Sequence, residues 1–147
     1  MAISTAAIGK TYAPVEYAVG REKIREYALA VGETNALHHD VEHAREQGYR
    51  DVVALPMFCV VYCGPALAPA MFDPEIGIEF SRLLHSGQEF RWGPLVQGGD
   101  EVTTTLTVKD ISARGDMGFY TFESVTTNQD GDTVCVGIWS NIVRGAQ

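Results

Sequence analysis

Cationic residues are scarce in this sequence. Among its 147 residues, 11 are Lys or Arg and 19 are Asp or Glu, which gives a formal net charge of −8 with neutral histidines. No segment carries a dense run of Lys and Arg. Such runs supply the electrostatic attraction for sequence-independent binding to nucleic acid and for docking on anionic membranes. We therefore expect neither nucleic acid nor a membrane among the partners.

Cysteine is also scarce, with Cys59, Cys63 and Cys135 as the only three. An odd number of cysteines in a chain of this size indicates a reducing compartment rather than a disulfide framework. No basic residue precedes the small apolar stretch of residues 1–9, so we expect no export signal and a cytoplasmic location.

Several motifs that define catalytic or cofactor sites are absent. The sequence has no C-x-x-C or H-E-x-x-H metal pattern, no G-x-S-x-G nucleophile turn, no P-loop and no dinucleotide-binding fingerprint. Cys59 and Cys63 lie in an uncharged segment, where burial raises a thiol pKa and usually makes the thiol inert. We expect neither a metal nor a redox cofactor.

The length fits one domain, residues 1–147, and a hydrophobic content of 46% is enough for a core. Residues 52–72 carry no charge, and this stretch is about as long as a bilayer span. Prolines interrupt it, and acidic rather than cationic residues flank it. We therefore predict a helix buried inside the domain, continuous or broken only near Gly64 and Pro65.

The remaining periodicities predict an α+β domain. Apolar residues recur at helical spacing over residues 21–31, and Asp40 stands where it could cap a short helix that runs to Gln47. From residue 76 onward the period becomes that of strands, with an extended stretch at 87–96 and three further strands joined by Gly-containing turns. One antiparallel sheet curled around a single apolar helix accommodates these elements.

The loop at residues 32–40 reads G-E-T-N-A-L-H-H-D. It resembles the G-D-x-N-P-[IL]-H-x-D signature of the MaoC-like (R)-specific enoyl-thioester hydratases and dehydratases. The resemblance extends to the V-G-R-E-K-I segment at 19–24, the V-A-L-P-M-F segment at 53–58 and the Gly-Asp step at 99–100. It implies a hot-dog fold, in which a sheet wraps around a central helix.

The resemblance also implies an activity and a set of site residues. Such enzymes interconvert (3R)-hydroxyacyl and trans-2-enoyl thioesters of CoA or acyl carrier protein (ACP) without a cofactor. Glu33 and His38 match the acidic residue and the histidine that hold one water, a pairing suited to general acid–base chemistry near neutral pH. The positions expected to bind substrate are Asn35, Ala54, Leu55, Met57 and Phe58.

Three positions depart from the family pattern. Glu33 is one methylene longer than Asp, Ala36 replaces a proline, and Pro56 replaces a glycine whose N–H would face the thioester oxygen. An A-x-P helix start is similar to that of the substrate-holding halves of two-subunit dehydratases. The alternative function is therefore a non-catalytic, substrate-binding subunit with a catalytic hot-dog partner. Thioesterase activity on the same fold is less favoured, because the loop signature is that of hydratases.

Each candidate residue also has a purely structural interpretation. His38 could bond only to backbone, Glu33 could be a solvated loop charge, and Asn35 could form an Asx turn. Met57 and Phe58 could simply pack at the helix start.

We further expect at least a dimer, homomeric or with another hot-dog chain, because one such unit leaves a sheet edge unpaired.

Overall fold

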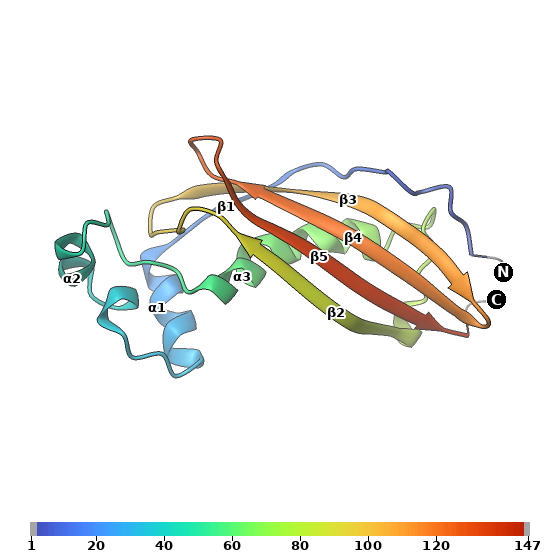
Figure 1. Cartoon of the computed structure of the whole chain (residues 1–147), viewed down its shortest axis with the longest axis horizontal. Helices are drawn as coiled ribbons and strands as arrows, with labels where there is room; N and C mark the ends of the chain where they lie inside the picture. The colour runs from blue at the N-terminus through green and yellow to red at the C-terminus, as the bar shows by residue number, and fades with distance from the viewer. Residues whose placement is uncertain (1–2, 146–147) are drawn as a thin grey trace.

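A computed structural model describes residues 3–145, so the expected domain boundaries at 1 and 147 lie outside the described part. One five-stranded antiparallel sheet forms the body of the molecule (Figure 1). The strand order across the sheet is β1-β3-β4-β5-β2. The strands are β1 (Val15–Ala18), β2 (Leu83–Trp92), β3 (Glu101–Arg114), β4 (Met117–Thr127) and β5 (Thr133–Arg144).

The meander predicted for the last three strands is confirmed. β3 pairs with β4 and β4 with β5, both antiparallel. The β3–β4 hairpin turns through Gly115, whose φ of 60° favours glycine. β2 begins at Leu83, four residues before the predicted stretch, because its register with β5 extends to the Leu83–Val143 pair. β1 was not predicted, since four residues are too short for a periodicity signal.

The helices before the central segment follow the predicted pattern. α1 (Arg21–Ala30) ends before Gly32, which adopts a φ of 74°. A short 3-10 helix, η1 (Ala36–His38), lies in the loop that follows. The side chain of Asp40 accepts hydrogen bonds from the N–H groups of Glu42 and His43 and so caps α2 (Val41–Glu46), as expected.

The prediction of a helix throughout residues 52–72 is wrong at its start. Val53 forms a β-bridge with Gln97, and the N–H of Ala54 donates to the carbonyl of Val96, so the chain stays extended until the helix begins at Pro56. The helix then alternates in type along its length. Its segments are η2 (Pro56–Phe58), α3 (Cys59–Cys63), η3 (Gly64–Leu67) and α4 (Ala68–Met71).

The predicted break near Gly64 and Pro65 is present as the change from α3 to η3. Pro65 has no N–H to donate within the helix, which explains the change in hydrogen bonding. Burial is also incomplete, because Met57 and Phe72 are 45% and 70% exposed.

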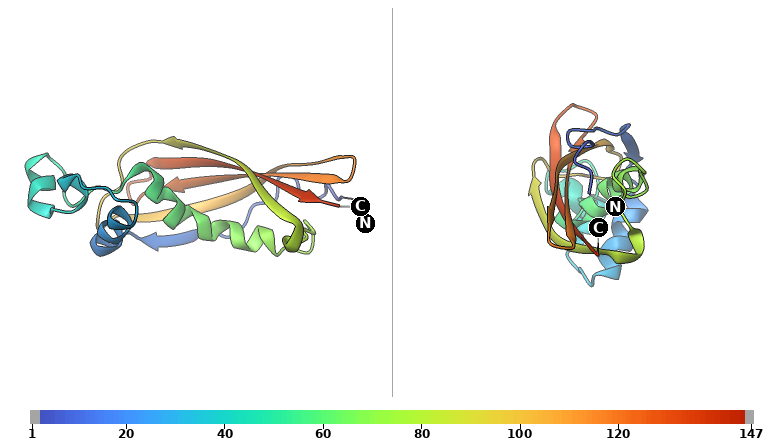
Figure 2. Two further views of the ribbon diagram at one scale, coloured as in Figure 1. Left: turned by 90° about the horizontal axis from the view of Figure 1, so that it is seen from below. Right: turned by 90° about the vertical axis from the view of Figure 1, so that its right-hand side faces the viewer.

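The central helix runs along one face of the sheet, and the strands bend around it (Figure 2). Alternate residues of β4 are buried toward the helix, as the strand period requires. The core joins Phe58 and Tyr62 of the helix to Leu106 and Phe122 of the sheet. This arrangement confirms the α+β class and the sheet-around-helix architecture. Within residues 3–145, no helix is long and apolar enough to cross a membrane.

A charged network joins the N-terminal segment to the end of the central helix. Asp73 accepts hydrogen bonds from the hydroxyl of Tyr12, at 2.6 Å, and from the backbone N–H of Glu75. The ammonium of Lys10 lies 2.6 Å from the same carboxylate. The hydrogen bond from Lys10 and, to a smaller extent, the one from Tyr12 lower the pKa of Asp73 to about 2.

We expect Asp73→Asn to lower stability at neutral pH and to have little effect near pH 2. A carboxyl whose pKa is depressed in the folded state stabilises the protein above its unfolded pKa of about 4, and this contribution disappears as the pH falls toward 2. Urea midpoints at pH 7 and pH 2 measure the difference between variant and wild type. An equal loss at both pH values would contradict the assignment, and the more exposed Glu75→Gln serves as control.

Candidate active site

The loop at residues 32–40 folds back on α1 and then crosses to the extended segment before the central helix. The N–H of Glu33 donates to the carbonyl of Ala28, at 2.9 Å, and the N–H of Val53 donates to the carbonyl of Leu37, at 3.1 Å. Both ends of the loop are therefore attached to regular structure. A loop held in this way can present side chains in a fixed geometry.

His38 is half-buried, and its Nδ1 lies 2.6 Å from the carbonyl oxygen of Val53. A carbonyl can only accept, so Nδ1 carries the hydrogen of this bond. In the neutral ring the other nitrogen, Nε2, is then unprotonated and able to take a proton. The structure thus fixes the tautomer that a general base requires.

The carboxylate of Glu33 accepts a hydrogen bond from the backbone N–H of Asn35, at 2.8 Å. This bond, together with the N–H of Thr34 and the charges of His38 and His39, holds the pKa of Glu33 below its usual value. Glu33 is therefore ionised at neutral pH. The two expected catalytic residues, Glu33 and His38, lie on the same loop, five positions apart in the sequence.

Asn35 caps the short helix of the loop. Its side-chain oxygen accepts a hydrogen bond from the N–H of Leu37, at 3.0 Å, which is the Asx-turn geometry foreseen as its structural role. The side chain is exposed. Asn35 therefore has a local structural role whether or not it also meets a substrate.

An apolar cleft opens where the extended segment enters the central helix. Its volume is about 140 Å³. Trp92, at the end of β2, donates a hydrogen bond from Nε1 to the carbonyl of Pro56, at 2.8 Å, and so connects the edge strand to the helix start. The lining residues are Ala54, Leu55, Pro56, Tyr62, Trp92, Gly93, Pro94, Leu95, Val96 and Val134.

The expected substrate residues divide into two groups around this cleft. Ala54 and Leu55 line it, and Ala54 directly follows Val53, the residue that binds His38. Met57 and Phe58 are not part of the lining. Met57 is 45% exposed, whereas Phe58 is 1% exposed and packs against other aromatic rings.

The wall formed by residues 92–96 was not among the expected site residues. Trp92 alternates with Phe90 at strand spacing, a pattern that is typical first of a core or interface face and only second of an acyl-binding wall. The Gly-Pro step at 93–94, directly after an alternating strand, is a signal that the chain turns there. Gly93 is required at this turn, because a Cβ would lie 2.1 Å from the carbonyl oxygen of Thr133.

The cysteines have no catalytic environment. Cys59, Cys63 and Cys135 are buried and free. Hydrogen bonding among these thiols, followed by burial, leaves the pKa values of Cys59 and Cys135 raised, that of Cys59 to about 12. In the part of the chain that the structure describes, no three His, Cys, Asp or Glu side chains converge as a metal site would require.

Comparison with known sequences gives one family. Residues 6–136 match the family model described as FAS1-like, dehydratase domain region. The chain is 38% identical over 146 residues to a UPF0336 protein of Saccharopolyspora erythraea, covering 99% of this chain and 94% of that protein. It is 40% identical over 144 residues to a UPF0336 protein of Leifsonia xyli subsp. xyli, covering 97% of each.

Solved structures share the fold. The C-terminally truncated HadBC complex of Mycobacterium tuberculosis, a (3R)-hydroxyacyl-ACP dehydratase, contains a chain that superimposes with a TM-score of 0.79 at 22% identity. That match covers 94% of this chain and 98% of the other. A MaoC-like dehydratase matches with a TM-score of 0.84 at 25% identity over 96% of this chain, but over only 43% of its own longer chain.

Proposed function

Because the chain belongs to the FAS1-like dehydratase-region family, we propose that it interconverts (3R)-hydroxyacyl and trans-2-enoyl thioesters of CoA or ACP. The observation that supports this most directly is that one loop carries an ionised carboxylate, Glu33, and a histidine, His38, whose Nε2 can accept a proton. The Nδ1 of His38 donates to the carbonyl of Val53, the residue directly before Ala54, which lines the apolar cleft. Residues of these types can move a proton near neutral pH without a metal or redox cofactor. We expect the chain to act in a reducing cytoplasm.

In the proposed hydration, one water lies between the Glu33 carboxylate and Nε2 of His38. One of these groups takes a proton from the water as its oxygen bonds to C3 of the enoyl thioester. The same group then returns this proton to C2, and the double bond becomes a single bond. Dehydration follows the same path in reverse, with the hydroxyl leaving from C3 as water.

In this proposal the acyl chain occupies the cleft between the helix start and the end of β2. Ala54 and Leu55 contact it directly, and Met57 lies beside the entrance. Phe58 supports the wall from within, because it packs against Tyr62, which lines the cleft. Asn35 fixes the loop that carries the reacting groups.

The experiment that tests the proposal is hydration of crotonyl-CoA by the purified chain, alone and then with any hot-dog protein encoded beside it. The loss of the conjugated enoyl absorbance gives the rate. We expect hydration in at least one of these two assays. If neither the chain nor its complexes hydrate the substrate, the proposed function is wrong.

Pro56 favours a second candidate, a non-catalytic subunit that contributes part of an acyl tunnel to a catalytic partner. A proline at the first helical position has no N–H to offer a thioester oxygen. Its carbonyl is already bound by Trp92. In this case a complex would hydrate crotonyl-CoA, but its rate would not depend on His38.

We predict that the protein is at least a dimer in solution. β2 is the last strand of the sheet, and Leu84 and Trp92 near its two ends are 43% and 49% exposed. An unpaired edge with apolar side chains is a favourable surface for pairing with a second hot-dog chain. Light scattering at micromolar concentration measures the mass, and a monodisperse monomer would contradict the prediction.

A further inference from the structure

His39 is outside the proposed reacting pair, yet its side chain spans the loop. Its Nε2 lies 2.6 Å from the backbone carbonyl oxygen of Glu33, six residues earlier. Since a carbonyl can only accept, Nε2 carries the hydrogen of this bond. The imidazole is half-buried. The bond therefore joins the end of the loop to its beginning. It holds the backbone of Glu33, whose carboxylate is proposed to bind the water.

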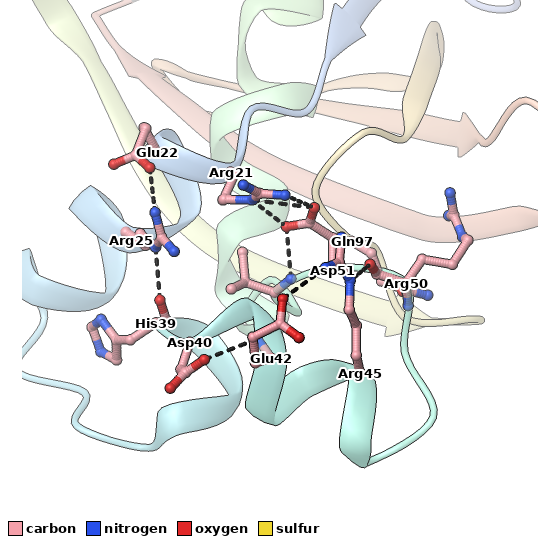
Figure 3. A network of polar contacts seen from close by, with 11 residues as sticks. Arg21, Glu22, Arg25, His39, Asp40, Glu42, Arg45, Arg50, Asp51 and Gln97 are labelled. Carbon is pink, nitrogen blue, oxygen red and sulfur yellow. Dashed lines mark hydrogen bonds and ion pairs between the residues drawn. The ribbon is translucent and has the colours of Figure 1, made fainter.

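Arg25 also binds His39, through the backbone carbonyl of that residue. Its Nε donates a hydrogen bond to the carbonyl oxygen of His39, at 2.7 Å, and its guanidinium also pairs with Glu22 on α1 (Figure 3). The contact links a regular helix to the loop backbone. One continuous chain of hydrogen bonds thus runs from Arg25 through His39 to Glu33.

The loop needs such contacts to be rigid. Residues 32–40 contain no proline, and only three of them form a 3-10 helix. His38 is attached to Val53 through its side chain. Among residues 3–145, the carboxylate of Glu33 has no equivalent hydrogen bond to a residue outside the loop. The Glu33 carboxylate and the His38 ring can share one water only if their separation stays constant. This requires a constant distance between the backbone of Glu33 and the peptide that joins His38 to His39.

We propose that His39 and Arg25 are positioning residues that fix the distance between Glu33 and His38. This inference rests on the proposed function, since it concerns the same site. The hydrogen bond of His39 holds the backbone of Glu33, and that of Arg25 holds the backbone next to His38. A displacement of about 1 Å at a reacting group can cost on the order of a hundredfold in rate, so contacts outside the reacting pair can control turnover.

The test compares two substitutions of His39 in whichever assembly hydrates crotonyl-CoA. Leucine fills the space without a hydrogen-bond donor, whereas the side-chain amide of glutamine keeps an N–H at similar reach. We expect His39→Leu to lower kcat by about tenfold or more with KM nearly unchanged, and His39→Gln to restore kcat to within about threefold of wild type. A merely structural role would not give this recovery together with a selective loss of kcat.

Arg25 gives an independent comparison on α1. Arg25→Ala removes the bond to the carbonyl of His39, and we expect a loss of kcat similar to that of His39→Leu. Lys23→Ala is the matched control, because within the described part of the chain Lys23 pairs with Glu26 on the same helix and not with the loop. Should His39→Leu fail to fold, His39→Asn takes its place, since its shorter amide cannot span the same distance.

Parallel measurement of His38→Ala separates the two proposals. If His38→Ala leaves the rate unchanged, the proposed catalytic function is wrong. Suppose that His38→Ala abolishes hydration, but the folded His39 variant and Arg25→Ala both keep the wild-type kcat. The proposed function then stands, and the positioning role is overturned.

Discussion

His38→Ala is expected to lower the rate of crotonyl-CoA hydration by about a hundredfold or more, the usual scale for loss of a general acid–base group. The substitution removes the ring whose Nδ1 is held by the carbonyl of Val53 and whose Nε2 is proposed to handle the proton of the attacking water. Steady-state kinetics at saturating substrate measure the loss. The unfolding temperature should change little, because the ring is only half-buried and, among the residues that the structure describes, makes one side-chain hydrogen bond.

Glu33 provides the companion variants. Glu33→Gln removes the charge and should lower the rate, whereas Glu33→Asp shortens the side chain by one methylene and should preserve or raise it. An unchanged rate for a complex that carries His38→Ala would contradict the catalytic role. The chain would then be the tunnel-forming subunit.

The sequence was most informative where the signals are local. Asp40 at a helix start and Gly32 after a helix end each adopt the capping geometry that their residue types predict. The three last strands follow their alternation and Gly-containing turns. These features depend on neighbours within a few residues, so periodicity and turn chemistry are enough to find them.

The features that the sequence did not reveal depend on contacts between distant segments. Residues 52–55 are apolar enough for a helix, but pairing of Val53 and Ala54 with residues 96–97 keeps them extended. The bonds from Arg25 to His39 and from Trp92 to Pro56 likewise join segments 14 and 36 residues apart. No pattern of spacing along the chain encodes such pairs.

Phe58 separates core packing from substrate contact at the start of the central helix. Its side chain is 1% exposed. Its ring packs edge-on against that of Tyr27, with the ring centroids 5.5 Å apart, and the centroid of the Tyr62 ring lies 6.2 Å away. We expect Phe58→Ala to lower the free energy of unfolding by about 3 to 5 kcal/mol, because it removes a large buried ring and leaves a cavity. The urea midpoint measures this loss.

Met57→Ala is the matched control, since the neighbouring side chain is 45% exposed and should contribute less than about 1 kcal/mol. Tyr27 belongs to α1, the helix that also carries Arg25. Loss of Phe58 should therefore loosen the attachment of α1 to the central helix, and kcat should fall together with stability. If Phe58→Ala instead keeps the wild-type urea midpoint and raises only KM, the ring is part of the substrate wall, and the aromatic packing around it does not hold the site together.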